Sequence, residues 1–150
     1  MEKMINLKID GNNVSIEEGK TILDAAQKLN IKIPTLCHHP DLCVAGNCRI
    51  CVVEQEGARN LTPSCSTPVS EGMNIRTNTI KVMTARKHIL ELLLSEHNTD
   101  CSFCYKSGNC ELQILTNEYK IPKQSFINLV SLKNYTIDYY SHSIIKDDSK

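Results

Sequence analysis

Four cysteines in the first half of the chain are spaced closely enough to share one site. The pattern C-x10-C-x2-C-x13-C is formed by Cys37, Cys48, Cys51 and Cys65. Cysteine thiolates hold iron-sulfur clusters, and a C-x2-C pair on a tight loop presents two sulfurs to one metal. Gly46 precedes this pair, and its tolerance of positive φ would let the loop turn its backbone N–H groups toward sulfur.

A fifth cysteine, Cys43, leaves a second ligand set open. With Cys48 and Cys51 it forms C-x4-C-x2-C, which is the opening of the plant-type ferredoxin spacing. The alternative is that Cys43 is a small buried or loop thiol without a role, as cysteine often is. The spacing by itself does not decide between Cys37 and Cys43 as the first ligand.

A second group of metal-binding side chains follows in the C-terminal half. The pattern H-x3-C-x2-C-x5-C is formed by His97, Cys101, Cys104 and Cys110. Ser107 and Gly108 supply a turn before the last cysteine. Taken alone, three cysteines and one histidine suit a structural zinc site about as well as an iron-sulfur cluster. Zinc ribbons, however, place their C-x2-C pairs about 15 to 20 residues apart, whereas 49 residues separate Cys51 from Cys101.

Short elements should position the first group. Apolar residues alternate with polar ones over 5–9 and 14–16 on either side of an Asp-Gly pair, which predicts a β-hairpin. Thr21 is placed to cap a helix over 22–29, whose apolar residues recur with helical spacing. A strand is expected over 50–53, after the cysteine loop. The predicted order is therefore strand, strand, helix, loop and strand.

Helices should position the second group. An apolar stripe over 79–96 predicts a long, partly buried helix that ends where the second group begins. A shorter helix is predicted from residue 111 to about 119, terminated by Pro122. Farther along, 134–137 and 143–145 have the composition of short strands.

Composition and charge exclude several classes of function. The 17 Lys and Arg residues balance 17 Asp and Glu residues, so no basic field favours nucleic acid. Residues 1–10 lack the apolar run of a signal peptide, and no apolar stretch approaches the roughly 20 residues of a membrane helix. Eight grouped cysteines fit metal or redox chemistry in a reducing cytoplasm, so a cytoplasmic protein without membrane insertion is expected.

Catalytic motifs are missing from the sequence. It contains no G-x-G-x-x-G fingerprint, no phosphate-binding loop, and no clear nucleophile with its base. A catalytic subunit in its own right therefore lacks support, and no catalytic residue is predicted. Substrate chemistry is expected on another subunit or on a further part of a longer polypeptide.

Four short segments carry a resemblance to a known family. They are PTLC at 34–37, GNCRICVVE at 46–54, ILELLLSEH at 89–97 and CELQ at 110–113. In this order they resemble the N-terminal iron-sulfur region shared by iron-iron hydrogenases, the large iron-sulfur subunit of NADH dehydrogenase (complex I) and NAD-dependent formate dehydrogenases. The resemblance spans about residues 5–113. Ser102 and Tyr105, where the complex I form usually has proline and an acidic residue, fit the hydrogenase and formate dehydrogenase branches better.

The resemblance implies two cofactors and their ligands. One 2Fe-2S cluster would be held by Cys37, Cys48, Cys51 and Cys65, which leaves Cys43 free. One 4Fe-4S cluster would be held by His97, Cys101, Cys104 and Cys110. His38 stands where the family commonly has an aromatic residue, and both His38 and His39 are expected to be ordinary loop histidines.

The implied architecture is an α+β fold in two parts. A β-grasp 2Fe-2S ferredoxin-like domain would occupy residues 1–78, and a small helical domain binding the His/Cys3 4Fe-4S cluster would occupy residues 79–120. Residues 121–150 would be a tail or a linker towards a following domain or partner. Parts of this tail, 135–138 and 143–150, resemble the segment that precedes a two-cluster ferredoxin domain in iron-iron hydrogenases.

The implied function is electron transfer, one electron at a time, through the two clusters. The chain would be a subunit or the N-terminal part of a hydrogenase, formate dehydrogenase or NADH-linked oxidoreductase. Its partners would be other subunits or domains of that complex, such as a ferredoxin or a flavin-containing NADH-oxidising subunit, and not nucleic acid. The alternative, from a different class, is a zinc-stabilised interaction module in which both cysteine groups are structural.

Overall fold

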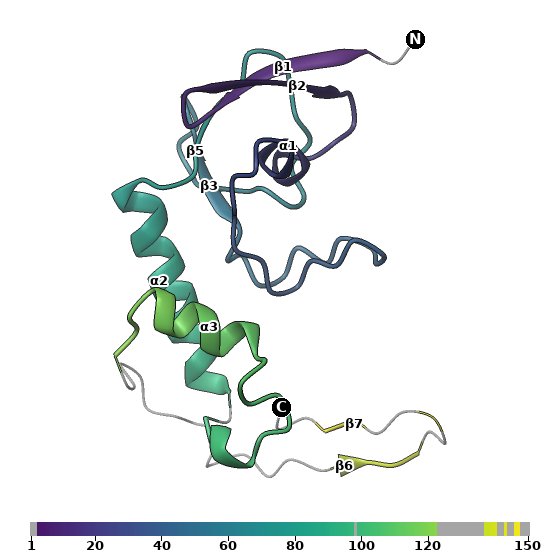
Figure 1. The fold of residues 1–150 in the computed structure, drawn as a ribbon, viewed down its shortest axis with the longest axis vertical. Helices are drawn as coiled ribbons and strands as arrows, with labels where there is room; N and C mark the ends of the chain where they lie inside the picture. Colours follow the sequence, from purple (N-terminus) through teal and green to yellow (C-terminus); the bar gives the residue numbers. More distant parts are fainter. Residues whose placement is uncertain (1–2, 98, 123–136, 141–142, 144–145, 148–150) are drawn as a thin grey trace. The chain divides into compact units, whose positions relative to one another are not determined.

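The computed structural model describes residues 3–97, 99–122, 137–140, 143 and 146–147. The chain forms two compact units, Met1–Ile89 and Leu90–Lys150. The first contains a mixed sheet, one complete helix and the first half of a second helix, and the second unit is built mainly from helices (Figure 1).

The sheet of the first unit has five strands in the order β2-β1-β5-β3-β4. Their bounds are β1 Met4–Ile9, β2 Asn12–Glu17, β3 Val52–Gln55, β4 Thr62–Pro63 and β5 Asn74–Arg76. Strands β1 and β2 are antiparallel, whereas β1 and β5 are parallel. Strand β3 runs antiparallel to both β5 and β4. The last strand of the unit therefore inserts beside the first, and the predicted α+β class is confirmed.

The first two strands form the predicted hairpin. Ile5 faces Ile16 and Leu7 faces Val14 across the ladder. The two loop residues, Asp10 and Gly11, both have positive φ, 49° and 84°. Positive φ at both central positions is the condition for a type I′ turn, whose twist matches that of the flanking strands.

Helix α1, Ile22–Lys28, begins with a complete capping box. The Asp24 N–H donates to Thr21 Oγ1 at 3.2 Å, and the Thr21 N–H donates to Asp24 Oδ2 at 2.8 Å. Both bonds satisfy N–H groups that the first turn of a helix leaves without a partner. The predicted cap at Thr21 is confirmed. Helix α1 lies beside the β1–β2 hairpin (Figure 1), and the buried apolar residues of both belong to one core.

The strand predicted over 50–53 is displaced along the chain. Ile50 is fully buried but lies in a turn, and β3 begins only at Val52. Arg49 takes a left-handed φ of 61°, and the Val52 N–H donates to the Arg49 carbonyl at 3.3 Å. This turn follows Cys48 directly, so the backbone reverses between the two cysteines of the C-x2-C pair.

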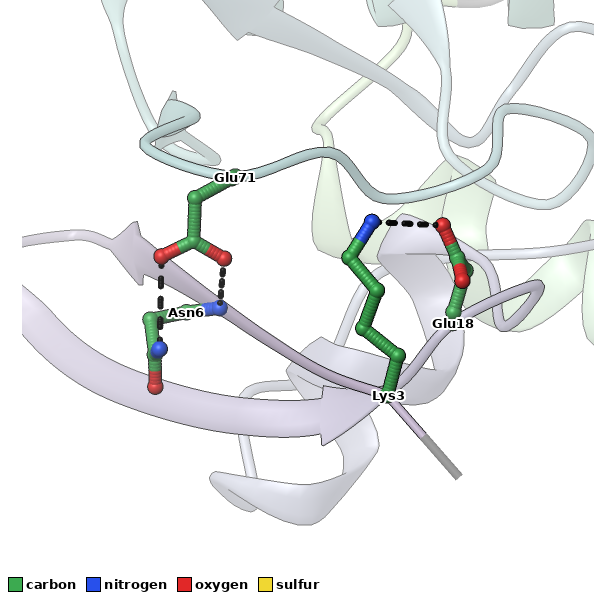
Figure 2. A network of polar contacts seen from close by, with 4 residues as sticks. All are labelled: Lys3, Asn6, Glu18 and Glu71. Carbon is green, nitrogen blue, oxygen red and sulfur yellow. Dashed lines mark hydrogen bonds and ion pairs between the residues drawn. The ribbon is translucent and has the colours of Figure 1, made fainter. Parts of the chain in front are cut away.

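Polar contacts tie the hairpin to the loop before β5. Figure 2 shows the Glu71 carboxylate accepting from the backbone N–H and the side-chain amide of Asn6, at 2.8 and 3.2 Å. Lys3, which precedes β1, pairs with Glu18, which follows β2, at 3.1 Å. These contacts are exposed to solvent, so each stabilises the fold by roughly 0 to 1 kcal/mol.

The helices predicted in the second half are present with small changes of boundary. Helix α2 is Ile80–Glu96, the 3-10 helix η1 is Cys101–Phe103, and α3 is Glu111–Glu118. Helix α3 ends before Lys120, whose φ of 51° breaks the helical conformation two residues ahead of Pro122. Among the described residues, none of these helices combines the length and hydropathy that a membrane crossing requires.

Two short antiparallel strands, β6 Ile137–Asp138 and β7 Lys146–Asp147, lie near the C-terminus. Strands were predicted over 134–137 and 143–145. Of the residues in these ranges that the structure describes, Ile137 lies in a strand and Ser143 lies in a bend. Residues 134–136 and 144–145 lie outside the described residues.

Candidate functional site

The first site is built around two buried thiols. The Sγ atoms of Cys51 and Cys65 lie 3.3 Å apart, and both residues are 2% exposed. Two thiolates on one tetrahedral metal lie about 3.8 Å apart when the metal–sulfur distance is about 2.3 Å. A separation of 3.3 Å therefore needs only a small adjustment for both sulfurs to bind one metal.

The other two thiols form a second pair in the loop that precedes the turn. The Cys48 N–H donates to Cys37 Sγ at 3.4 Å. Burial alone would raise the pKa of Cys37, but hydrogen bonds from the Cys48 N–H, the Cys48 thiol and the Asn47 N–H outweigh it and lower that pKa. Gly46 has the expected positive φ, 62°. The loop thus turns N–H groups toward sulfur, as its sequence predicted.

The two pairs of thiols lie close enough for their charges to act on one another. Burial raises the pKa of Cys65, and the contact with the Cys51 thiol and the charges of Cys51, Cys37 and Cys48 raise it further, to about 12. Burial also raises the pKa of Cys48. Cys43 is exposed in the same loop. The structure therefore gathers Cys37, Cys48, Cys51 and Cys65, and it places Cys43 at the surface.

Two buried polar side chains hold the backbone at Cys51. Ser64, fully buried, donates its hydroxyl to the Cys51 carbonyl at 2.9 Å, and its N–H donates to the same oxygen at 3.2 Å. Arg86 donates from Nη2 to the Val52 carbonyl at 2.8 Å. Sequence reasoning did not single out either residue. A signal for Arg86 existed, because it lies four residues from both Val82 and Leu90, in the middle of a buried stripe.

First-turn N–H groups of α1 position the segment that carries Cys65. The Leu23 N–H donates to the Ser64 carbonyl at 3.0 Å, and the Ile22 N–H donates to the Thr67 carbonyl at 3.0 Å. The helix that the capping box starts is thus bonded to the residues on both sides of Cys65.

The two loop histidines differ in their surroundings. His39 is exposed, and its Nδ1 accepts from the Asp41 N–H at 3.3 Å. His38, next to Cys37, is half-buried, and its Nδ1 is enclosed without a hydrogen-bond partner in the described part of the chain. The exposed His39 has the surroundings expected of an ordinary loop histidine, whereas the half-buried His38 does not.

The second site is a cavity of about 700 Å³ in the second unit. The side chains predicted as ligands, His97, Cys101, Cys104 and Cys110, all line it. Apolar residues, among them Leu94 and Leu112, and polar residues, among them Thr116, complete the wall. The structure therefore brings the four residues together around one space.

Short-range hydrogen bonds shape the loop that carries these cysteines. The Cys104 N–H donates to the Cys101 carbonyl at 3.2 Å, and the Ser107 N–H donates to the Cys104 carbonyl at 3.0 Å. Gln113, from α3, accepts from the Gly108 N–H through Oε1 at 3.2 Å. Gln113 was not predicted as a site residue, and its contact fixes the turn before Cys110.

Two aromatic side chains are exposed on this loop. Phe103 and Tyr105, which flank Cys104, are 86% and 81% exposed. Lys106 places its Nζ 5.9 Å from the centre of the Tyr105 ring. The site therefore lies directly under the surface of its unit.

The spacing of both donor sets is compatible with iron-sulfur clusters. Over the described residues, no three His, Cys, Asp or Glu side chains close on one point at single-ion distance. Iron-sulfur clusters place several irons and sulfides at the centre, so their four protein ligands stand apart from one another. Two thiol pairs at the first site and four donors around a cavity at the second fit that arrangement.

Two family models match the chain over adjoining ranges. The model described as a 2Fe-2S iron-sulfur cluster binding domain matches residues 2–80. The model described as the NADH-ubiquinone oxidoreductase-G iron-sulfur binding region matches residues 86–125. The first range contains the four gathered thiols, and the second contains the cavity with His97.

Curated relatives include subunits of two kinds of enzyme. The chain is 48% identical to the NADP-reducing hydrogenase subunit HndD of Solidesulfovibrio fructosivorans over 98% of its own length, which is 26% of the relative. It is 45% identical to the NADH-ubiquinone oxidoreductase 75 kDa subunit of Reclinomonas americana over 77% of its length, which is 17% of that relative. The chain thus spans about a quarter or less of these proteins.

A solved structure has the same fold. The crystal structure of an NAD+-reducing NiFe-hydrogenase in the H2-reduced state superposes with a TM-score of 0.82 and 31% identity. The match covers 90% of this chain and 56% of that one.

Proposed function

The chain belongs to the 2Fe-2S iron-sulfur cluster binding domain family, and from that premise we propose which residues hold its clusters and which enzyme it serves. It is an iron-sulfur electron-transfer module with a 2Fe-2S domain and a 4Fe-4S region, as the sequence predicted. The resemblance to the hydrogenase and complex I region is confirmed as well. The comparisons lend the zinc-stabilised interaction module no support.

We propose that Cys37, Cys48, Cys51 and Cys65 hold the 2Fe-2S cluster. The observation that carries this proposal is the buried Cys51–Cys65 pair at 3.3 Å, coupled electrostatically to Cys37 and Cys48. One pair would bind each iron. Cys43 lies outside this set because its side chain is exposed in the loop.

His97, Cys101, Cys104 and Cys110 are the proposed ligands of the 4Fe-4S cluster. Support comes from their common cavity of about 700 Å³. A neutral imidazole in place of a thiolate leaves the donor set with three negative charges, which favours a higher reduction potential, as histidine ligation does in Rieske centres.

The mechanism follows from what the chain does around these donors. When bound, each cluster stores and releases one electron reversibly. The N–H groups of Asn47 and Cys48 stabilise negative charge on the Cys37 sulfur, and the buried walls around Cys51 and Cys65 exclude water. Each cluster has four proposed protein ligands, so no coordination position is left for a substrate.

The proposed division assigns 1–78 to the 2Fe-2S domain, 79–120 to the 4Fe-4S domain and 121–150 to a linker or tail. The ranges of the two family models, 2–80 and 86–125, support this proposal. Helix α2 would then belong to the second domain, although its first half, with Arg86, contacts the first domain at Val52.

Among possible parent enzymes, an NAD(P)-linked hydrogenase is favoured. The match to the hydrogenase subunit covers 98% of the chain, whereas the match to the 75 kDa subunit covers 77%. Ser102 and Tyr105 also fit the hydrogenase branch. The proposed partners are a ferredoxin or a flavin-containing NADH-oxidising subunit, in a cytoplasm that keeps the thiols reduced.

Metal and acid-labile sulfide analysis of anaerobically prepared protein tests this function. About six iron and six sulfide per chain are expected from one 2Fe-2S and one 4Fe-4S cluster. Electron paramagnetic resonance of the reduced protein should show two signals that differ in temperature dependence. A folded protein that retains zinc and contains no sulfide after reconstitution would contradict the proposal.

A further inference from the structure

Arg86 is a buried charged residue of the first unit. It is 3% exposed, and it lies on α2 between Val82 and Leu90, both fully buried. Burying a charge costs free energy unless hydrogen bonds compensate it. The guanidinium of arginine also keeps its delocalised positive charge in proteins. Residue 86 thus carries a permanent positive charge in a place where an apolar side chain would fit the stripe.

The guanidinium contacts the backbone next to a proposed ligand. Nη2 donates to the Val52 carbonyl at 2.8 Å, and Val52 follows Cys51 directly. The Cys51 carbonyl in turn accepts from the Ser64 hydroxyl at 2.9 Å. Successive carbonyls are therefore held by Arg86 and Ser64, and Ser64 precedes Cys65. The two side chains fix the backbone on which the buried thiol pair stands.

A positive charge in this position would affect the reduction potential of the site as well as the geometry of its backbone. Four thiolates already make the site negative, and reduction adds one further negative charge. A nearby cation stabilises the reduced form more than the oxidised form, and in a buried environment solvent screens it little. An exposed cation on the same helix would act far more weakly.

We propose that Arg86 is the positioning residue of the 2Fe-2S site that raises its reduction potential through its buried charge. The inference rests on the proposed function, because it takes Cys51 and Cys65 as ligands. It goes beyond that function by assigning a role to a residue outside the ligand set.

Redox titration with dithionite tests the proposal. Electron paramagnetic resonance monitors the reduction of each cluster during the titration and gives its reduction potential. Arg86→Gln removes the charge and keeps a donor, Arg86→Lys keeps the charge, and Lys87→Gln removes an exposed charge from the neighbouring position. In Arg86→Gln, the equilibrium constant for reduction of the 2Fe-2S site should fall at least tenfold, which is about 59 mV for one electron. Arg86→Lys and Lys87→Gln should stay within about twofold of the wild type.

The 4Fe-4S cluster is an internal control, and its equilibrium constant for reduction should change by less than twofold in all three variants. An unchanged 2Fe-2S potential in Arg86→Gln, or an equal fall in Lys87→Gln, would overturn the role of Arg86. If Arg86→Gln does not assemble the site, Arg86→Lys decides alone. An equilibrium constant for reduction equal to that of the wild type supports a role for the charge, and a tenfold fall in that constant refutes it. A wild-type protein without a 2Fe-2S signal would refute the proposed function instead.

Discussion

The thiols of Cys51 and Cys65 lie 3.3 Å apart although the residues are fourteen positions apart in the sequence. Cys51 follows the left-handed turn at Arg49, and Cys65 lies just beyond the short strand β4, which pairs with β3. The pairing of Val52 with Pro63 sets the register that brings the two side chains together. The sheet, rather than the loop alone, therefore builds the buried half of the site.

Substitution of the loop cysteines should distinguish the cluster ligand from the cysteine that does not bind the cluster. Cys43→Ser is expected to keep the 2Fe-2S signal because Cys43 is exposed. Cys37→Ser should lose the signal or alter it severely, because the Cys37 thiol is paired with Cys48. Absorption and electron paramagnetic resonance spectra of the reconstituted variants provide the measurement. The opposite result would show that Cys43, and not Cys37, is the first ligand.

Replacement of His97 should change the second site selectively. His97→Cys adds a negatively charged ligand, so the cluster should be retained with a reduction potential lowered by on the order of 100 mV. The 2Fe-2S potential serves as the control and should not move. A 4Fe-4S potential equal to that of the wild type would show that His97 is not a ligand.

Alkylation of the cluster-free protein should follow the thiol pKa values. At about pH 8 a thiol with a lowered pKa has more reactive thiolate than an ordinary cysteine, and one with a raised pKa has less. Cys37 should therefore react with iodoacetamide well before Cys65, whose pKa is about 12. Mass spectrometry of timed samples, in a Cys43→Ser background, measures the order.

Accessibility is separated from pKa by varying the pH. The reaction of Cys65 should keep accelerating as the pH rises beyond the ordinary thiol range, whereas that of Cys37 should level off earlier. In concentrated guanidinium chloride the two rates should converge. Equal rates in the folded protein would argue against the hydrogen-bonded environment of Cys37.

The buried hydroxyl of Ser64 should contribute to stability. Ser64→Ala removes the bond from Oγ to the Cys51 carbonyl and should lower the free energy of unfolding by about 1 kcal/mol. Ser66→Ala is the matched control, because Ser66 is exposed on the other side of Cys65. Its effect should stay within about 0.5 kcal/mol. Urea denaturation of both variants, monitored by circular dichroism, tests the difference, and equal effects would exclude a special role for Ser64.

Local elements were predictable because they depend on neighbours in the chain. The alternation around Ile5 and Leu7, the Asp-Gly turn and the Thr21 cap each involve residues a few positions apart, and all three appear in the structure. The strand predicted from Ile50 was misplaced by two residues. The β-branched Ile50 favoured a strand there, but Ile50 lies in a turn that follows the left-handed Arg49 and is closed by the bond from the Val52 N–H to the Arg49 carbonyl.

The metal-binding side chains could likewise be identified from the sequence, because the ability of a residue to donate to a metal is a chemical property of its side chain. Which thiol lies beside which, and which polar groups surround them, were decided by contacts between distant segments. Strand β1 pairs with β5 between Lys8 and Asn74, and Arg86 reaches Val52 across 34 positions. Such contacts form only when loops close and a common core is buried, so a pattern read along the chain does not contain them.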